Sequence, residues 1–106
     1  MDFKEYQEKA RKTAVYGDAG LLYTILGLSG EAGEVSEIVK KKMRKVGSST
    51  FNLGQDEINA IASELGDVLW YVANCCFELG IDMDKIAKQN IVKLEKRKKK
   101  GELTER

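Results

Sequence analysis

The sequence predicts an all-α fold, organised as a four-helix bundle-like subunit. Proline is absent from all 106 residues, and no segment shows the sustained apolar–polar alternation that is typical of a strand. Apolar residues recur instead at helical spacing, as on the buried stripe of an amphipathic helix. A chain of this length has room for one hydrophobic core, so residues 1–106 are expected to form a single domain.

The first two helices are predicted from apolar stripes and from the break between them. A helix over 2–16 would bury Phe3, Tyr6, Ala10 and Ala14 on one face. The pair Gly17-Asp18 interrupts this pattern, and Asp18 is a suitable N-cap for a second, long helix over 19–46. Three glycines inside that stretch favour a kink there: Gly27, Gly30 and Gly33.

The second half of the chain is divided by a loop and a glycine stop. Small and polar residues over 47–54 predict a loop, after which a third helix covers 55–79 and ends before Gly80. Asp82 is then placed to cap a fourth helix over 83–99. Apart from the basic run at residues 96–100, no low-complexity segment interrupts this order.

Composition excludes several classes of function. The net charge is +1, so no global field favours nucleic acid or a membrane as a partner. No apolar run is long enough to span a bilayer, and the N-terminus does not resemble a signal peptide. The adjacent Cys75 and Cys76 are interpreted as reduced core residues of a cytoplasmic protein. Histidine is absent, which excludes imidazole bases and most zinc sites.

Two acidic pairs interrupt the apolar pattern of the second and third predicted helices. Glu31 and Glu34 lie one turn apart, and so do Glu64 and Asp67. A buried carboxylate is costly unless it is paired, and four such groups also repel one another. Because only oxygen ligands are on offer, a hard divalent cation is the natural partner: Mg²⁺, with Mn²⁺ as a substitute.

The alternative is that these pairs lie on solvated helix faces, where acidic residues are common. Small neighbours weigh against it, because glycine inside a helix costs about 1 kcal/mol relative to alanine. The neighbours are Ala32, Gly33 and Gly66. They predict that the two backbones approach closely beside the carboxylates, and we favour the metal site.

The acidic motifs and their surroundings resemble a known family. The segments 27–35 and 64–71 are similar to the two metal helices of the all-α nucleoside triphosphate pyrophosphohydrolases, the MazG-like group, and 90–97 resembles its substrate segment. The likeness covers about residues 20–100, with a longer loop region between the acidic pairs than is usual. It implies Mg²⁺-dependent cleavage between the α- and β-phosphates, giving a monophosphate and pyrophosphate, in nucleotide-pool housecleaning.

The resemblance also suggests roles for individual residues. Glu34 is the candidate for orienting the attacking water, and Glu37 is a weaker one because it projects off the metal face. On the fourth helix, Lys93 and Arg97 would hold phosphates and Asn90 a sugar hydroxyl. A solvated basic face is the other interpretation of that stripe. Two more candidates complete the substrate set: Lys41, on the metal face of its helix, and Tyr71, for which core packing is the alternative.

The third predicted helix is apolar over more than half of its circumference. Trp70 and Phe77 share a flank that one small subunit would leave exposed, so we expect a second chain to cover it. The family forms dimers and tetramers, which agrees with a homodimer or homotetramer. From a different class, the chain could instead be a non-catalytic helical oligomerisation or nucleotide-sensing module. Di-iron chemistry is disfavoured because its Glu-x-x-His motifs need histidine.

Overall fold

The computed structural model describes residues 1–101, and the all-α prediction is confirmed there. The elements in order are α1 (Phe3–Lys12), the 3-10 turn η1 (Gly17–Ala19), α2 (Gly20–Val46), α3 (Gln55–Leu79) and α4 (Met83–Lys99). The predicted bounds of the third and fourth helices and of the loop between residues 47 and 54 are confirmed. No described helix has the length and apolar character needed to cross a bilayer.

The first helix ends four residues earlier than predicted. Its start agrees, because the Asp2 carboxylate accepts the N–H of Glu5 at 2.8 Å as an N-cap. At the other end the Thr13 hydroxyl donates to the Ala10 carbonyl at 2.7 Å, and the Thr13 N–H donates to the same carbonyl at 3.1 Å. This local bonding satisfies a last-turn carbonyl that a continuing helix would have used.

The second helix begins at Gly20 and not at a cap formed by Asp18. Asp18 lies inside the 3-10 turn, and Gly20 follows with a φ of +50°, a conformation that favours glycine. From there α2 continues as one helix through all 27 residues, its internal glycines included. The expected break in the chain is therefore confirmed, whereas the predicted cap is wrong.

Caps of different kinds fix the ends of α3 and α4. The Glu57 carboxylate accepts the N–H of Gly54 at 2.6 Å, and Gly80 ends α3 in the left-handed region at φ +70°. Asp82 occupies the N-cap position of α4, but its side chain makes no capping bond. The Met83 N–H donates instead to the Gln7 side-chain oxygen of α1 at 2.9 Å.

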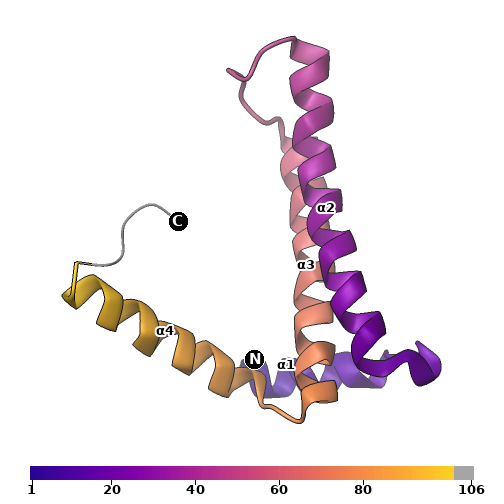
Figure 1. Ribbon diagram of the computed structural model, residues 1–106. Coiled ribbons are helices and arrows are strands. Elements are labelled where there is room, and N and C mark those ends of the chain that lie inside the picture. The colour runs from indigo at the N-terminus through magenta and orange to yellow at the C-terminus, as the bar shows by residue number, and fades with distance from the viewer. Residues whose placement is uncertain (102–106) are drawn as a thin grey trace.

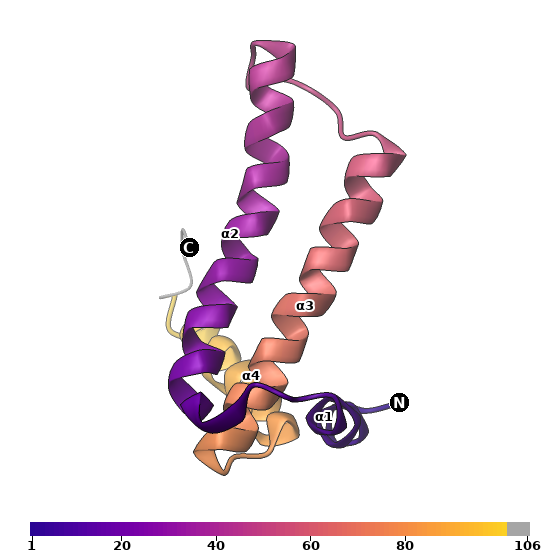
Figure 2. The same cartoon turned by 90° about the vertical axis from the view of Figure 1, so that its right-hand side faces the viewer.

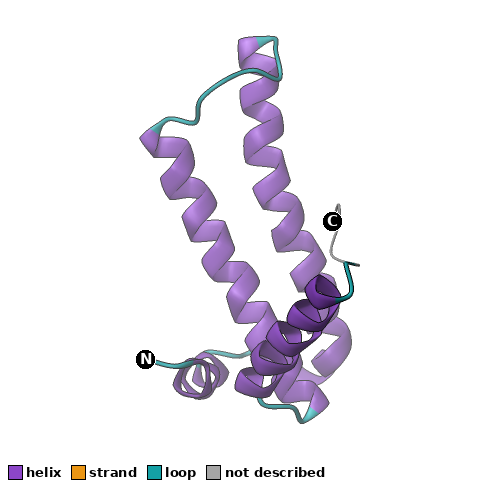
Figure 3. Ribbon diagram, turned by 90° about the vertical axis from the view of Figure 1, so that its left-hand side faces the viewer, coloured by secondary structure: helices purple, strands orange, loops and turns teal. Residues whose placement is uncertain are grey.

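The helices form a long hairpin with two arms at its base. In Figure 1, α2 and α3 run antiparallel, with the loop 47–54 at one end. At the opposite end α1 packs across α3 (Figure 2). Helix α4 projects sideways from the hairpin in Figure 1 and therefore lies in front of it in Figure 3. The Cα radius of gyration is 16.8 Å, compared with about 13 Å for a compact domain of this length.

The core is small and lies where α1, α3 and the start of α4 meet. Its buried apolar members are Ala10, Ala73, Cys76 and Met83. Trp70 packs against this cluster from α3, so α1 of the same chain covers a ring for which a second chain was expected. Phe77 remains 45% exposed, although the Arg11 guanidinium lies 3.9 Å from its ring centroid. The premise that one subunit leaves the whole Trp70–Phe77 flank bare is therefore wrong for Trp70.

Candidate functional site

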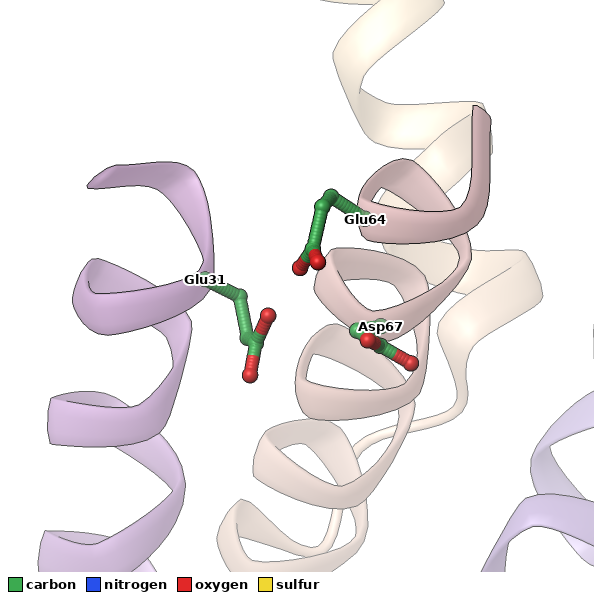
Figure 4. A group of neighbouring side chains, drawn as sticks. All are labelled: Glu31, Glu64 and Asp67. Atoms are coloured by element: carbon green, nitrogen blue, oxygen red, sulfur yellow. The ribbon is translucent and has the colours of Figure 1, made fainter. Parts of the chain in front are cut away.

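Three carboxylates meet between the two helices of the hairpin. Glu31 extends from α2 toward Glu64 and Asp67 of α3, as Figure 4 shows. One carboxylate oxygen from each lies within 4.8 Å of the other two. Glu31 and Glu64 are half-buried and Asp67 is exposed. Glu31 thus forms one oxygen-only cluster with two carboxylates that lie 33 and 36 residues further along the chain.

The three carboxylates influence one another electrostatically. The pKa of Glu31 rises to about 7, first because its carboxyl group shares a hydrogen bond with Glu64 and then because of partial burial. Repulsion from the charges of Glu64 and Asp67 raises it further. Three hard oxygen donors at this separation suit a divalent cation such as Mg²⁺, whose charge would reverse the repulsion. The donor set therefore fits a metal ion.

A glycine on α2 lets the two helices meet beside this cluster. A Cβ added at Gly27, one turn before Glu31, would overlap the ring of Tyr71. Added at Gly33 or Gly66 it would meet nothing within 4 Å. The two helices thus approach closely in this region, as expected. The prediction that Gly33 and Gly66 allow this approach is wrong, because the contact is at Gly27. A side chain, not a backbone, occupies the space at Gly27.

An ion pair joins the same two helices nearer the loop. Lys42 of α2 lies 3.1 Å from the Glu57 carboxylate of α3, with both side chains mostly shielded from solvent. The Gly54 N–H and then the Lys42 ammonium hold the pKa of Glu57 below its usual value. Two contacts therefore join α2 and α3. The Tyr71 ring packs against Gly27 on one side of the acidic cluster, and Lys42 pairs with Glu57 on the other.

The remaining acidic and basic candidates of α2 lie apart from the cluster. Glu34 is exposed, and its carboxylate is not among the three grouped oxygens. Glu37 pairs instead with Arg44 at 3.3 Å and with Lys40 at 3.9 Å, which agrees with a solvated role. Lys41 is exposed and lies ten residues beyond Glu31, about 15 Å along the helix.

The candidates on α4 are not brought to the carboxylates within one chain. Asn90 and Lys93 are exposed and Arg97 is half-buried. Among the described residues, no Cα of α4 lies within 8 Å of one in α2. Helix α4 leaves the base of the hairpin and extends away from it (Figure 1). The stripe of polar groups is therefore present, but a single subunit does not place it over its own acidic cluster.

A pocket of about 410 Å³ opens beside the carboxylates. Glu31, Asp67 and Tyr71 line it together with two residues that the sequence did not single out for a site, Thr13 and Trp70. Trp70 follows Asp67 by three residues, a helical spacing that could have indicated it. Thr13 carries no such signal, because 57 positions separate it from Trp70 and it lay inside a predicted helix.

Tyr71 both packs against Gly27 and lines the pocket beside the carboxylates. Its pKa rises to about 12, first through hydrogen bonding with Tyr23 and then through burial. The charges of Glu31 and Asp67 add to this shift, so its phenol remains protonated at neutral pH. Tyr71 is thus both a packed residue and a wall of the pocket, which joins the two interpretations that its position in the sequence left open.

Comparison with known proteins adds an independent finding. A family model described as the MazG nucleotide pyrophosphohydrolase domain matches residues 20–101. The Gene 37 protein of Mycobacterium phage L5 is 38% identical over 103 residues, which cover 91% of this chain and 88% of that relative. No solved structure matches the chain. The matched span contains α2, α3 and α4 with all of the clustered carboxylates, whereas α1 lies before it.

Proposed function

The chain belongs to the MazG nucleotide pyrophosphohydrolase family, and from that premise we propose that it hydrolyses (deoxy)nucleoside triphosphates to the monophosphate and pyrophosphate. The observation that carries the proposal is the meeting of Glu31, Glu64 and Asp67 between α2 and α3. We further propose that the whole chain acts as one domain and that it removes unwanted nucleotides from the pool.

The carboxylate cluster is proposed to hold a divalent cation, Mg²⁺ or Mn²⁺. Glu31, Glu64 and Asp67 supply the oxygen ligands, and Glu34 is one turn away on α2 as a fourth. Such a cation, when bound, would neutralise phosphate charge and would lower the pKa of a water that it holds. Without histidine in the chain, a carboxylate must accept the proton of the attacking water. We assign that task to Glu34, which is exposed to solvent.

The basic stripe of α4 is proposed to bind the leaving group. Water attacks the α-phosphorus, the bond to the bridging oxygen breaks, and pyrophosphate leaves with both of that bond's electrons. Lys93 and Arg97 suit the β- and γ-phosphates, because ammonium and guanidinium groups form strong charge-assisted bonds to phosphate oxygens. Asn90 suits a sugar hydroxyl, and Lys41 is proposed as an additional phosphate contact.

Product analysis with carboxylate variants tests this function. Wild-type protein with Mg²⁺ and a dNTP should release dNMP and pyrophosphate, separated by ion-exchange chromatography. Glu31→Gln, Glu64→Gln and Asp67→Asn should each reduce the rate by more than about 100-fold. Losing a residue that only hydrogen-bonds to a metal ligand costs less, about 10–100-fold. Glu34→Gln should do the same if it handles the proton.

A matched control lies on the same helix. Glu37→Gln removes a carboxylate that is paired with Arg44, and it should retain most of the wild-type rate. Release of dNDP and orthophosphate would contradict the proposed bond cleavage. Full activity in excess EDTA would contradict the metal. Binding of a dNTP without any turnover would favour the non-catalytic sensing module instead.

A further inference from the structure

The pocket beside the carboxylates has two chemically different sides. Glu31 and Asp67 form an acidic side, and the rings of Trp70 and Tyr71 form an aromatic one. Its volume of about 410 Å³ is within the range of small-molecule sites. Given the proposed function, the acidic side would meet the metal-bound phosphates. The aromatic side offers the flat surface on which a planar base can stack.

The Trp70 indole is held in place from several directions. Its ring is nearly perpendicular to the ring of Tyr71, with centroids 5.0 Å apart, and to the ring of Tyr16, with centroids 6.3 Å apart. Its N–H donates to the Thr13 hydroxyl at 2.7 Å. The Thr13 hydroxyl donates its one proton to the Ala10 carbonyl, so its lone pairs can accept the hydrogen bond from the indole N–H. The bond that ends α1 therefore also orients Trp70.

This network determines what Trp70 can offer a ligand. Because its N–H is already bonded to Thr13, the indole presents only its aromatic surface and no free donor. Stacking of a base on an aromatic ring is worth about 1–3 kcal/mol and tolerates every base, since all have a π-face. A wall of this kind selects for a nucleobase over a bare phosphate chain, but distinguishes poorly between bases.

We propose that Trp70 is the stacking wall of a nucleobase subsite and that Thr13, in a segment outside the family match, is its positioning residue. The inference rests on the proposed function, because the same pocket must accept a nucleotide. It adds that Thr13, the C-cap of α1, takes part in substrate binding by positioning Trp70, although it contributes nothing to the carboxylate cluster. The competing interpretation is that Trp70 only joins α1 to the core.

Trp70 is the chain's one tryptophan, so its emission reports directly on the pocket. A non-hydrolysable α,β-methylene dATP with Mg²⁺ should change that emission saturably, and the corresponding dGTP and dCTP analogues should do so with similar affinity. Inorganic tripolyphosphate, which lacks a base, should compete for the site without the same change. An equal response to tripolyphosphate, or none to saturating nucleotide, would overturn the stacking wall.

Variants at Thr13 test the positioning role. Thr13→Val removes the acceptor at nearly constant volume and should raise KM about fivefold, as expected for one lost hydrogen bond, with a smaller change in kcat. Thr13→Ser keeps the hydroxyl and should restore KM and the nucleotide-induced emission change. A KM for Thr13→Val equal to that of wild type would overturn the positioning role.

The two hypotheses fail separately. Normal turnover without a base-dependent emission change would leave the hydrolase intact and reject the subsite. A base-dependent change without turnover would support the subsite and reject hydrolysis.

Discussion

At the scale of single residues, the surroundings of Glu31 change the chemistry of its carboxyl group strongly. Its pKa of about 7 compares with an ordinary 4.5, because Glu64 shares a proton with it and because it is partly buried near other carboxylates. Between these two pH values the folded protein binds more protons than the unfolded chain. The contribution of Glu31 to the free energy of unfolding is therefore fully present below pH 4.5. It is lost as the pH rises through about 7.

The first residue-scale prediction concerns this pH window in metal-free protein. In EDTA, Glu31→Gln should melt at a higher temperature than wild type at pH 8, and the advantage should shrink toward pH 5 as Glu31 becomes protonated. After a discount for solvent screening, we expect on the order of 1 kcal/mol, or about 4 °C. Thermal melts followed by circular dichroism would measure the difference in melting temperature between the two proteins at each pH. Other titrating groups are present in both proteins, so their effects cancel in this difference.

Added metal supplies the control for that experiment. Excess Mg²⁺ at pH 8 should stabilise the wild type more than Glu31→Gln, because the variant has lost a ligand, and so should reverse their order. Parallel melting temperatures from pH 5 to pH 8 in EDTA would contradict the account of Glu31.

The residues of the acidic cluster were predictable because helical spacing fixes faces. Glu64 and Asp67 lie one turn apart, so any packing of that face against Glu31 brings the three groups together. The side-chain conformation of Glu34 is not fixed by spacing, and it lies outside the cluster. Thr13 could not be found either, because its place depends on where α1 ends and on how α1 packs against α3.

At the scale of elements, α2 and α3 make a close contact beside the acidic cluster. Ring packing of Tyr71 against Gly27 sets how near α3 lies to α2, one turn from Glu31. Glycine in a helix interior is otherwise unfavourable by about 1 kcal/mol, so its presence there needs such a reason. A Cβ added at Gly33, six residues further along α2, would meet no neighbour within 4 Å.

These two glycines make a matched pair for the second prediction. Gly27→Ala should destabilise the protein by about 1–3 kcal/mol, because the new methyl group overlaps the Tyr71 ring. Gly33→Ala should stabilise it by up to about 1 kcal/mol through helix propensity alone. Urea unfolding of both variants in EDTA would measure the free energies. Equal effects of the same sign would show that Tyr71 does not set the distance between the helices.

The bounds of the long elements were predictable for the same local reasons that stabilise them. Gly80 ends α3 because only glycine adopts its left-handed conformation without cost, and the small polar loop before Gln55 precedes a helix start. The end of α1 was not predictable in this way. A threonine that bonds back to a carbonyl can either continue or end a helix, and tertiary contact with Trp70 decides.

At the scale of the whole molecule, the chain leaves much apolar surface uncovered. Ile91 and Val92 on α4 are 55% and 63% exposed, and Leu22 and Leu26 on α2 are both 71% exposed. Leu22 and Leu26 lie one turn apart on α2, and Ile91 and Val92 are adjacent on α4. Apolar patches exposed in this way mark interaction sites in soluble proteins. The sequence predicted four helices, but not that α4 would lie away from the hairpin. Helical periodicity identifies a buried face without saying which chain buries it.

The last prediction is that the protein is a homodimer or homotetramer in which α4 of one chain covers the hairpin of another. Two features motivate it: apolar faces on α4 and α2 that do not meet within a chain, and a basic stripe distant from its own carboxylates. Light scattering should report an oligomer at micromolar concentration. Val92→Glu should shift it toward monomer and lower activity, because a charge cannot be buried unpaired in an apolar interface.

Mixing inactive variants tests whether the site is shared. Glu31→Gln and Lys93→Ala should each be nearly inactive alone. If Lys93 serves the carboxylates of the partner, an exchanged equimolar mixture forms mixed dimers with one intact site, and activity should recover to about a quarter of wild type. A mixture of Glu31→Gln with Asp67→Asn should not recover, because both residues belong to the cluster of one chain. No recovery in the first mixture, despite exchange shown by a tagged subunit, would place Lys93 in its own chain's site.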